Sequence, residues 1–223
     1  MASKAKKEEL FADEILKWHK DKKISYPWRE TSDPYAVLTA EILLRKTTRL
    51  QVSRIFRDFL QKYPSFRELA SADRMKLEAL ISPLGMQVKR SELLIGMSRE
   101  IVEKYGGSLP LSKRQLEDIR GIGPYTANAV LAVLENAEMP MADTNVLRLI
   151  TRVFGLESKR ARARDDSEIW AFTAGIIPAG RSKDFNFAML DFADSVCRSR
   201  NPRCSECPIN GICSYWGKTS SRR

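Results

Sequence analysis

The sequence predicts an all-α protein made of short helices that are joined by tight turns. Apolar residues recur at three- and four-residue intervals along most of the 223-residue chain, a spacing typical of amphipathic helices. No convincing pair of alternating strands interrupts this pattern. Hydrophobic residues make up 43% of the chain, so we expect a packed interior, built as one large domain or as two small lobes.

Turn-forming residues divide the helical pattern into elements. Leu10, Phe11 and Ile15 recur at helical spacing in the first expected helix, and the prolines at 27 and 34 separate it from the second. Gly106 and Gly107 end the long helix that starts near Gln87. The expected helices are 8–20, 36–44, 50–60, one capped by Ser71-Ala72-Asp73 and ending at Ile81, 87–105, 112–119, 125–134, 144–154, 167–177 and 184–197.

The charge of the chain favours an anionic partner. Lys and Arg number 38 against 28 Asp and Glu, which gives a net charge of +10, and nucleic acid is the commonest partner of such a chain. Charge alone leaves open a basic protein whose surface is simply solvated. No apolar run approaches the roughly 18 residues of a membrane span, and no apolar signal core follows the N-terminus. We therefore expect no membrane partner and an intracellular protein, cytoplasmic or associated with the nucleoid.

A tight glycine turn lies between two expected helices. Gly121-Ile122-Gly123 is too short for a loose loop, and glycines let backbone N–H groups approach a phosphate closely. Pro124 suits the first turn of the next helix, whose positive end also attracts phosphate. Such a hairpin holds the DNA backbone without reading its sequence. A simple helix–helix corner is the alternative.

All four cysteines are concentrated near the C-terminus. Their spacing is Cys197-x6-Cys204-x2-Cys207-x5-Cys213, which indicates a metal site rather than a disulfide framework. Four thiolates can hold zinc or a [4Fe–4S] cluster. Common zinc sites use two close pairs, whereas this set has one close pair and two outlying ligands.

The hairpin, the cysteine spacing and a downstream segment together resemble a known family. Residues 116–127, 141–148 and 197–213 are similar to the helix-hairpin-helix DNA glycosylase superfamily that includes endonuclease III. The resemblance implies two helical lobes around a DNA-binding cleft, with residues 31–136 forming a barrel-like lobe that carries the hairpin. Residues 1–30 and 137–223 would form a discontinuous lobe that holds a [4Fe–4S] cluster on the four cysteines.

The resemblance also assigns catalytic roles to three residues. Asp143 corresponds to an essential aspartate that stabilises positive charge on the sugar, although capping the helix near Thr144 is a second use for it. Tyr125 stands where bifunctional members carry a lysine; a phenol cannot form a Schiff base, so we expect hydrolysis with little or no lyase activity. Glu41 interrupts an apolar helix, and its expected role is a buried acid or a water-positioning group.

The family must also turn its target nucleotide out of the duplex. Met86 or Gln87 corresponds to the wedge loop that fills the vacated space, and Arg45 or Lys46 is a candidate for a second probe. Core packing is an alternative role for Met86, because methionine fills irregular gaps.

The finer match is to archaeal thymine-mismatch glycosylases, carried by residues 43–48, Tyr125 and residues 142–145. It implies a monomer that removes thymine and uracil opposite guanine from double-stranded DNA during base excision repair. One alternative is an adenine glycosylase acting opposite guanine or oxidised guanine, since it shares Glu41, although such enzymes usually have a further C-terminal domain. The other is a noncatalytic DNA-binding module, for which neither Glu41 nor Asp143 would be needed.

Overall fold

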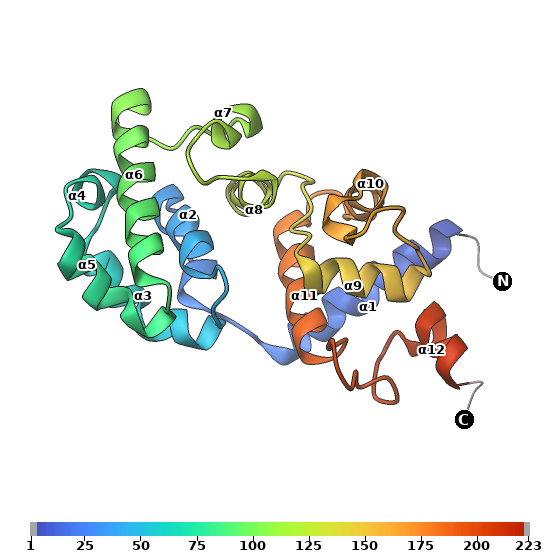
Figure 1. Ribbon diagram of the computed structural model, residues 1–223. Coiled ribbons are helices and arrows are strands. Elements are labelled where there is room, and N and C mark those ends of the chain that lie inside the picture. Colours follow the sequence, from blue (N-terminus) through green and yellow to red (C-terminus); the bar gives the residue numbers. More distant parts are fainter. Residues whose placement is uncertain (1–3, 221–223) are drawn as a thin grey trace. The chain divides into compact units, whose positions relative to one another are not determined.

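The computed structural model describes residues 4–220, and all regular elements in this range are helices (Figure 1). The prediction of an all-α fold is therefore confirmed. The elements are α1 (Lys4–Lys22), η1 (Pro27–Arg29), α2 (Pro34–Leu43), α3 (Arg49–Lys62), α4 (Phe66–Ala70), α5 (Arg74–Ile81), η2 (Ser82–Leu84), α6 (Gln87–Tyr105), α7 (Lys113–Glu117), α8 (Pro124–Leu134), α9 (Thr144–Phe154), η3 (Ala163–Asp165), α10 (Ser167–Gly175), α11 (Ser182–Ser195), η4 (Asn210–Ile212) and α12 (Ser214–Ser220).

The chain folds into two compact units. One unit is Ser25–Glu135, and the other combines Met1–Ile24 with Asn136–Arg223. The boundaries that the sequence predicts lie between residues 30 and 31 and between residues 136 and 137. We keep these boundaries as a proposal for the functional lobes. Within residues 4–220, no helix has both the length and the apolar character that crossing a membrane requires.

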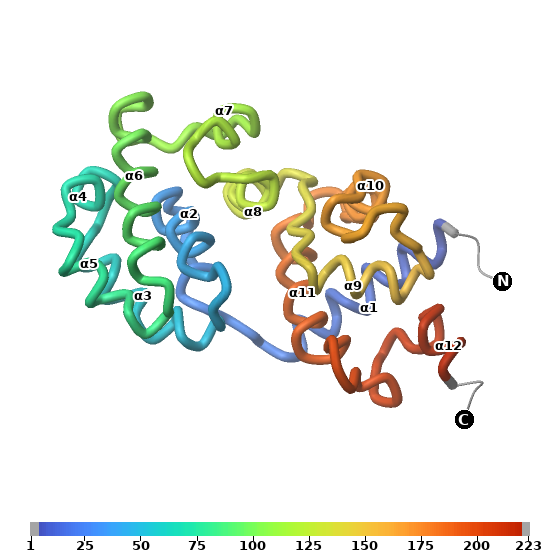
Figure 2. Tube along the Cα trace, in the orientation of Figure 1, coloured from blue at the N-terminus to red at the C-terminus, as the bar shows by residue number. Residues whose placement is uncertain are grey.

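The unit Ser25–Glu135 is built around α2. Every residue of α2 from Tyr35 to Leu43 is buried, because α3, α6 and α8 all pack against this helix. Figure 2 shows α6 running beside α4 and α5, the two short helices that pack against it. A helix covered on all sides is expected to be apolar all round, so the carboxylate of Glu41 within α2 requires a polar partner.

The other unit brings the two ends of the chain together. Helix α1 packs against α11, and α11 packs against α9. Phe11 of α1 is fully buried and meets Phe185 of α11 edge to face, with ring centroids 6.0 Å apart. Val146 and Ile150 on the inner face of α9 complete this core. Helix α9 is therefore fixed along its length, and the residues at its N-terminus inherit that rigidity.

Several short elements differ from the sequence-based expectations. The cap expected at 71–73 is Asp73 alone, whose side chain accepts from the N–H of Lys76. The helix expected over 112–119 is shorter, at Lys113–Glu117. Helices α4 and α12 were not expected, since five and seven residues are too few to show a helical period.

Arg90 of α6 is a buried cation that closes the C-terminal end of α2. Its Nη1 donates to the carbonyls of Ile42 (2.6 Å) and Leu43 (3.0 Å), and its Nη2 donates to the carbonyl of Arg45 (2.9 Å). The last carbonyls of a helix have no partner within the helix, and a positive group there also complements the helix dipole. Arg90 thus sets the position of the segment that follows α2.

We predict that Arg90→Met lowers the free energy of unfolding by about 2–4 kcal/mol, because it leaves buried carbonyls without donors. Urea unfolding followed by circular dichroism measures this loss. Lys89→Met removes the same charge from the exposed neighbouring position and should change stability by less than about 0.5 kcal/mol. Equal midpoints for both variants would contradict the role given to Arg90.

Candidate nucleic-acid interface and catalytic residues

The glycine hairpin connects α7 to α8, and each of its glycines has its own reason. Gly121 has φ +82°, and a Cβ there would lie 2.2 Å from Cδ1 of Leu93. Gly123 precedes Pro124 at the start of α8 with φ −97°, and a Cβ there would meet nothing within 4 Å. The fold therefore favours glycine at position 121, whereas the open space at Gly123 suits the close approach of another molecule to its backbone.

Ile122 anchors the hairpin. Its side chain is buried, and its N–H donates to the carbonyl of Ile119 (3.0 Å). This N–H is thus used within the protein. Gly123 and the first turn of α8, which carries the positive end of the helix dipole, form the part of the hairpin that suits a phosphate.

Arg45 supports the hairpin from the end of α2. Its Nη2 donates to the carbonyl of Gly121 (2.6 Å) and to Oγ1 of Thr126 (3.0 Å). The sequence suggested this side chain as a probe of the DNA stack. The structure uses its guanidinium to join α2 to the hairpin, a contact that sequence reasoning missed because it spans 76 residues.

Glu41 lies in a basic surrounding inside the same unit. Glu41 is 7% exposed, and it interacts electrostatically with both Arg29 and Arg45. Burial lowers the pKa of Arg29 to about 10, and attraction to Tyr26, Glu41 and Tyr125 opposes this shift. Arg29 is therefore a cation at neutral pH, and two nearby cations favour the carboxylate form of Glu41.

Arg29 is a site residue that the sequence analysis did not find. It is 9% exposed, and its guanidinium lies over the ring of Tyr26, 5.0 Å from the ring centroid. Its electrostatic interactions with Glu41 and Tyr125 place it with two of the expected catalytic residues. The local signal was an arginine among the aromatic residues of a turn, which alone does not identify a partner.

The expected wedge and probe positions share an unusual backbone. Met86 and Lys46 both have φ +53°, in the left-handed backbone region that residues other than glycine rarely adopt. Met86 is 49% exposed, and Gln87, the first residue of α6, is partly exposed. A core role for Met86 is thereby excluded. An apolar side chain held outward on a strained turn fits a residue that inserts into another molecule.

Asp143 caps α9 with both of its carboxylate oxygens. Oδ1 accepts from the backbone N–H groups of Asn145 and Val146, both at 2.8 Å, and Oδ2 accepts from Nδ2 of Asn145 at 2.9 Å. The residue stays partly exposed. The capping role is thus observed, and it holds a negative charge in a single orientation.

A chain of hydrogen bonds continues from Asp143 to the cysteine loop. Nη1 of Arg148 donates to Oδ1 of Asn145 (2.8 Å), and its Nε donates to the carbonyl of Cys197 (3.1 Å). Its Nη2 donates to the carbonyl of Ala193 (2.9 Å). Asn145 and Arg148 thereby connect the capping carboxylate to the first cysteine.

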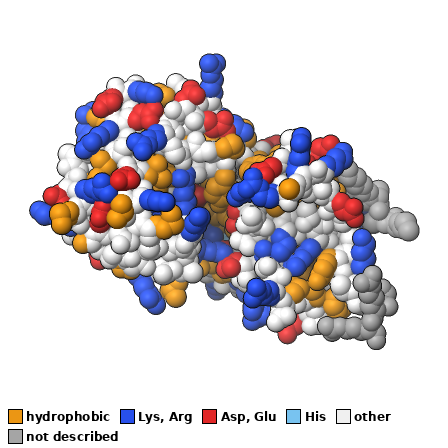
Figure 3. All heavy atoms as spheres, in the orientation of Figure 1, with side chains coloured by type: hydrophobic (Ala, Val, Ile, Leu, Met, Phe, Trp, Pro, Cys, Tyr) orange, Lys and Arg blue, Asp and Glu red, His pale blue; other side chains and the backbone are white. Residues whose placement is uncertain are grey.

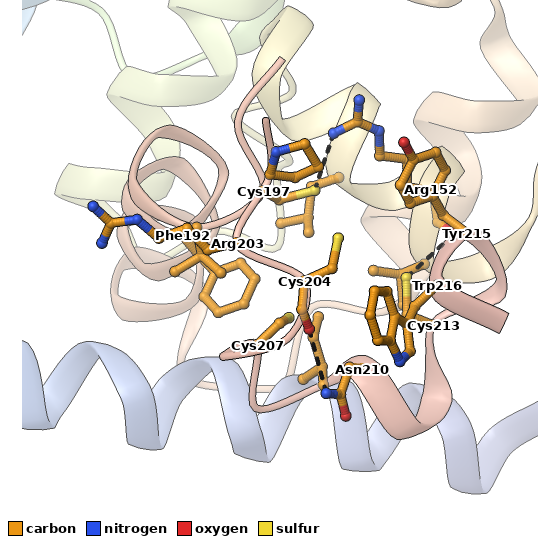
Figure 4. Close-up of a pocket in the computed structure, with 15 residues that line it drawn as sticks. Arg152, Phe192, Cys197, Arg203, Cys204, Cys207, Asn210, Cys213, Tyr215 and Trp216 are labelled. Atoms are coloured by element: carbon orange, nitrogen blue, oxygen red, sulfur yellow. Dashed lines mark hydrogen bonds between the residues drawn. The ribbon is translucent and has the colours of Figure 1, made fainter. Parts of the chain in front are cut away.

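The four cysteines surround one pocket, together with apolar residues of α9, α11 and α12. All four are free thiols, and their side chains lie around a shared space (Figure 4). A single tetrahedral zinc would bring its four sulfurs within about 3.8 Å of one another, from Zn–S bonds of about 2.3 Å. No three His, Cys, Asp or Glu side chains among the described residues are arranged to hold one metal ion.

This arrangement fits a group larger than one ion, held by the four sulfurs. Burial raises the pKa of the Cys207 thiol to about 11, and iron bound there would offset this by favouring the thiolate. Arg152 supplies positive charge at the rim: its Nη1 lies 3.7 Å from Sγ of Cys197 and 2.7 Å from the carbonyl of Arg198. The exposed basic residues of the loop are Arg200, Arg203 and Lys218.

Comparison with known proteins agrees with this geometry. A helical protein with a glycine hairpin and a four-cysteine loop is in the class of helix-hairpin-helix iron–sulfur proteins that bind DNA. The model of HhH-GPD superfamily base excision DNA repair proteins matches residues 39–172, and that of the iron–sulfur binding domain of endonuclease III matches residues 197–213. The chain therefore belongs to the HhH-GPD superfamily of base excision DNA repair proteins, and it carries a [4Fe–4S] cluster.

Individual relatives match over nearly their whole length. A thymine/uracil-DNA glycosylase of Pyrobaculum aerophilum is 42% identical, covering 93% of this chain and 92% of the relative. A thymine-DNA glycosylase of Aeropyrum pernix is 40% identical, covering 91% and 92%. The solved structure of a thermostable thymine-DNA glycosylase matches with a TM-score of 0.92 at 31% identity, covering 97% of this chain and 100% of that one.

The two hairpin glycines give a matched pair of variants. Gly121→Ala should lower the free energy of unfolding by about 1–3 kcal/mol, since it adds a clash to a left-handed backbone. Gly123→Ala should leave stability within about 0.5 kcal/mol and instead weaken binding to duplex DNA several-fold. Urea unfolding and fluorescence anisotropy measure the two effects. Unchanged DNA affinity of Gly123→Ala would remove this backbone from the interface.

Proposed function

We propose that this protein is a monofunctional DNA glycosylase. It acts as a monomer on double-stranded DNA and hydrolyses the N-glycosidic bond of thymine, or of uracil, mispaired with guanine. The observation that carries this proposal is the likeness, over nearly the full length, to relatives named thymine- and thymine/uracil-DNA glycosylases. An association with DNA in the nucleoid is part of the same proposal.

We assign the stabilisation of the sugar to Asp143. As the bond between C1′ and the base nitrogen breaks, its electron pair leaves with the base and positive charge grows on the sugar. A carboxylate already fixed by three N–H donors needs no reorganisation to meet that charge. Asn145 and Arg148 are positioning residues in this scheme, because they act through Asp143.

We assign to Glu41 the positioning of the attacking water. The nearby cations Arg29 and Arg45 favour the carboxylate form of Glu41, and a carboxylate can orient a water molecule and accept its proton as the new bond to C1′ forms. Thymine and uracil can depart as anions that their carbonyl groups stabilise. Adenine instead requires protonation of its ring, for which a carboxylate between two cations is a poor donor.

The remaining residues of the proposal open the duplex and hold its backbone. Met86 and Gln87 fill the space that the everted nucleotide leaves, and Lys46 is the second probe. The hairpin 121–123 and the cluster loop contact phosphates. In this proposal the lobe 31–136 carries the hairpin and the wedge and probe positions. The lobe formed by residues 1–30 and 137–223 carries the cluster loop. A mispaired base costs less to extrude, which gives a physical basis for a preference for mismatches.

The direct test incubates the protein with duplexes that contain T:G, U:G, A:G or A:oxidised-G, followed by alkali. We expect strand breaks only after alkali, in the T:G and U:G duplexes. Asp143→Asn keeps the cap, because Asn is an equally good N-cap residue, and should reduce single-turnover excision by at least 10²-fold while binding T:G duplex as tightly as the wild type.

Other outcomes of this test would decide between the alternatives. Excision confined to the adenine duplexes would identify an adenine glycosylase. Tight binding with no abasic product in any duplex would identify a noncatalytic module. Full activity of Asp143→Asn would contradict the role proposed for that carboxylate.

Tyr125→Lys provides a test of the position assigned to Tyr125. If this side chain faces the sugar, a lysine there should form an imine with it, and borohydride should trap a covalent protein–DNA adduct. The wild type should form no such adduct, because a phenol cannot make an imine. Tyr125→Met is the matched control without an amine, and an adduct formed equally by both variants would contradict the assignment.

A further inference from the structure

A groove lined by three arginines lies next to Asp143, outside both the hairpin and the cysteine loop. It has a volume of about 490 Å³ and is formed by α9 and the segment around η3. Its lining consists of Thr144, Leu147, Arg148, Thr151, Arg162, Ala163 and Arg164. Three arginines and two threonines are thus among the residues that line this groove, and no Asp or Glu is among them. Thr144, at one edge, directly follows the capping aspartate.

The segment that supplies two of these arginines is held in a defined conformation. Asp166 is 4% exposed, and its Oδ2 accepts from Oγ of Ser158 and from the N–H of Lys159, both at 2.9 Å. The indole N–H of Trp170 donates to the carbonyl of Arg164 (3.0 Å). The carboxylate of Asp166 is therefore committed to the backbone of the loop, and the arginines project from a fixed turn.

The positive charge of the groove is only partly balanced. Asp165 lies 2.7 Å from Nε of Arg162 and 3.8 Å from Nε of Arg164, so one exposed carboxylate serves two guanidiniums. Arg148 donates to two carbonyls and an amide oxygen, which hold its side chain, and attraction to Asp143 and Asp194 partly balances its charge. Hydroxyls and guanidiniums are both common phosphate ligands.

We propose that this groove binds backbone phosphates of the DNA, next to the target nucleotide. The proposal rests on the proposed function and extends it, because neither the hairpin nor the cysteine loop supplies these residues. Arg162 and Arg164 contact the phosphates, and Thr144 adds a hydroxyl donor, whereas the hydroxyl of Thr151 already donates to the carbonyl of Arg148 (3.1 Å). The groove thereby positions the strand beside Asp143. Figure 3 shows Lys and Arg side chains spread over the drawn face of both units.

The test compares two double variants that remove the same charge from one loop. Arg162→Gln with Arg164→Gln removes two of the three groove cations, whereas Lys159→Gln with Arg160→Gln removes two exposed cations that do not line the groove. Binding to a T:G duplex is measured by anisotropy over a range of salt concentrations, and thermal unfolding checks that both variants fold.

We expect the groove variant to bind about tenfold more weakly at low salt, with the slope of log Kd against log salt smaller by about 1–2, as for the loss of one or two phosphate contacts. The control should keep a slope near that of the wild type. Asp165→Asn removes the opposing carboxylate and should bind DNA more tightly. Equal losses in both double variants, or no loss in either, would overturn the proposal.

Free phosphate is the other source of the same chemistry. Inorganic phosphate and sodium chloride at equal ionic strength compete with the duplex in parallel. Two results together would show that the groove binds a free anion, and the proposal would then fail. Phosphate would weaken duplex binding more than sodium chloride does in the wild type alone, and the groove variant would keep the wild-type salt slope. Should the wild type excise no base while the groove variant still loses affinity and slope, the proposed function fails and the groove assignment stands.

Discussion

The N-cap of α9 is the interaction on which the candidate chemistry depends. A carboxylate that stabilises a transient cation must be held in place before the charge appears, since moving it during the reaction would cost free energy. Asp143 meets this condition because the start of a helix offers N–H donors that no other group satisfies. Helix α9 is in turn fixed by its buried inner face, which packs against α11. Folding and chemistry thus share one set of hydrogen bonds.

Buried arginines play a corresponding part in the unit Ser25–Glu135. Arg90 neutralises the carbonyl end of α2, Arg45 joins that helix to the hairpin, and Arg29 lies near Glu41. Removing a guanidinium from water is costly unless its donors are satisfied. Each of these arginines therefore constrains the segments that it contacts. A carboxylate such as Glu41 is retained in an apolar helix because cations from other elements surround it.

Arg148 extends the same principle to the cysteine loop. Its donors reach Asn145 on one side and the carbonyl of Cys197 on the other. A rearrangement of the loop would therefore change the contacts of Arg148 and Asn145, and through them the cap of α9. The cluster ligands and the capping carboxylate are parts of one hydrogen-bonded structure, although they lie far apart in the sequence.

The sequence by itself determined the helical class, the glycine turn between two helices, the spacing of the four cysteines and the capping character of Asp143. These depend on local spacing: helical period, turn glycines, a ligand pattern and a cap residue. Only the tertiary structure decided where the arginines go. Arg45 contacts a residue 76 positions away and Arg90 one that lies 48 positions away. A long cationic side chain looks alike in a sequence whether it is solvated or buried, because its partners are chosen by how distant helices pack.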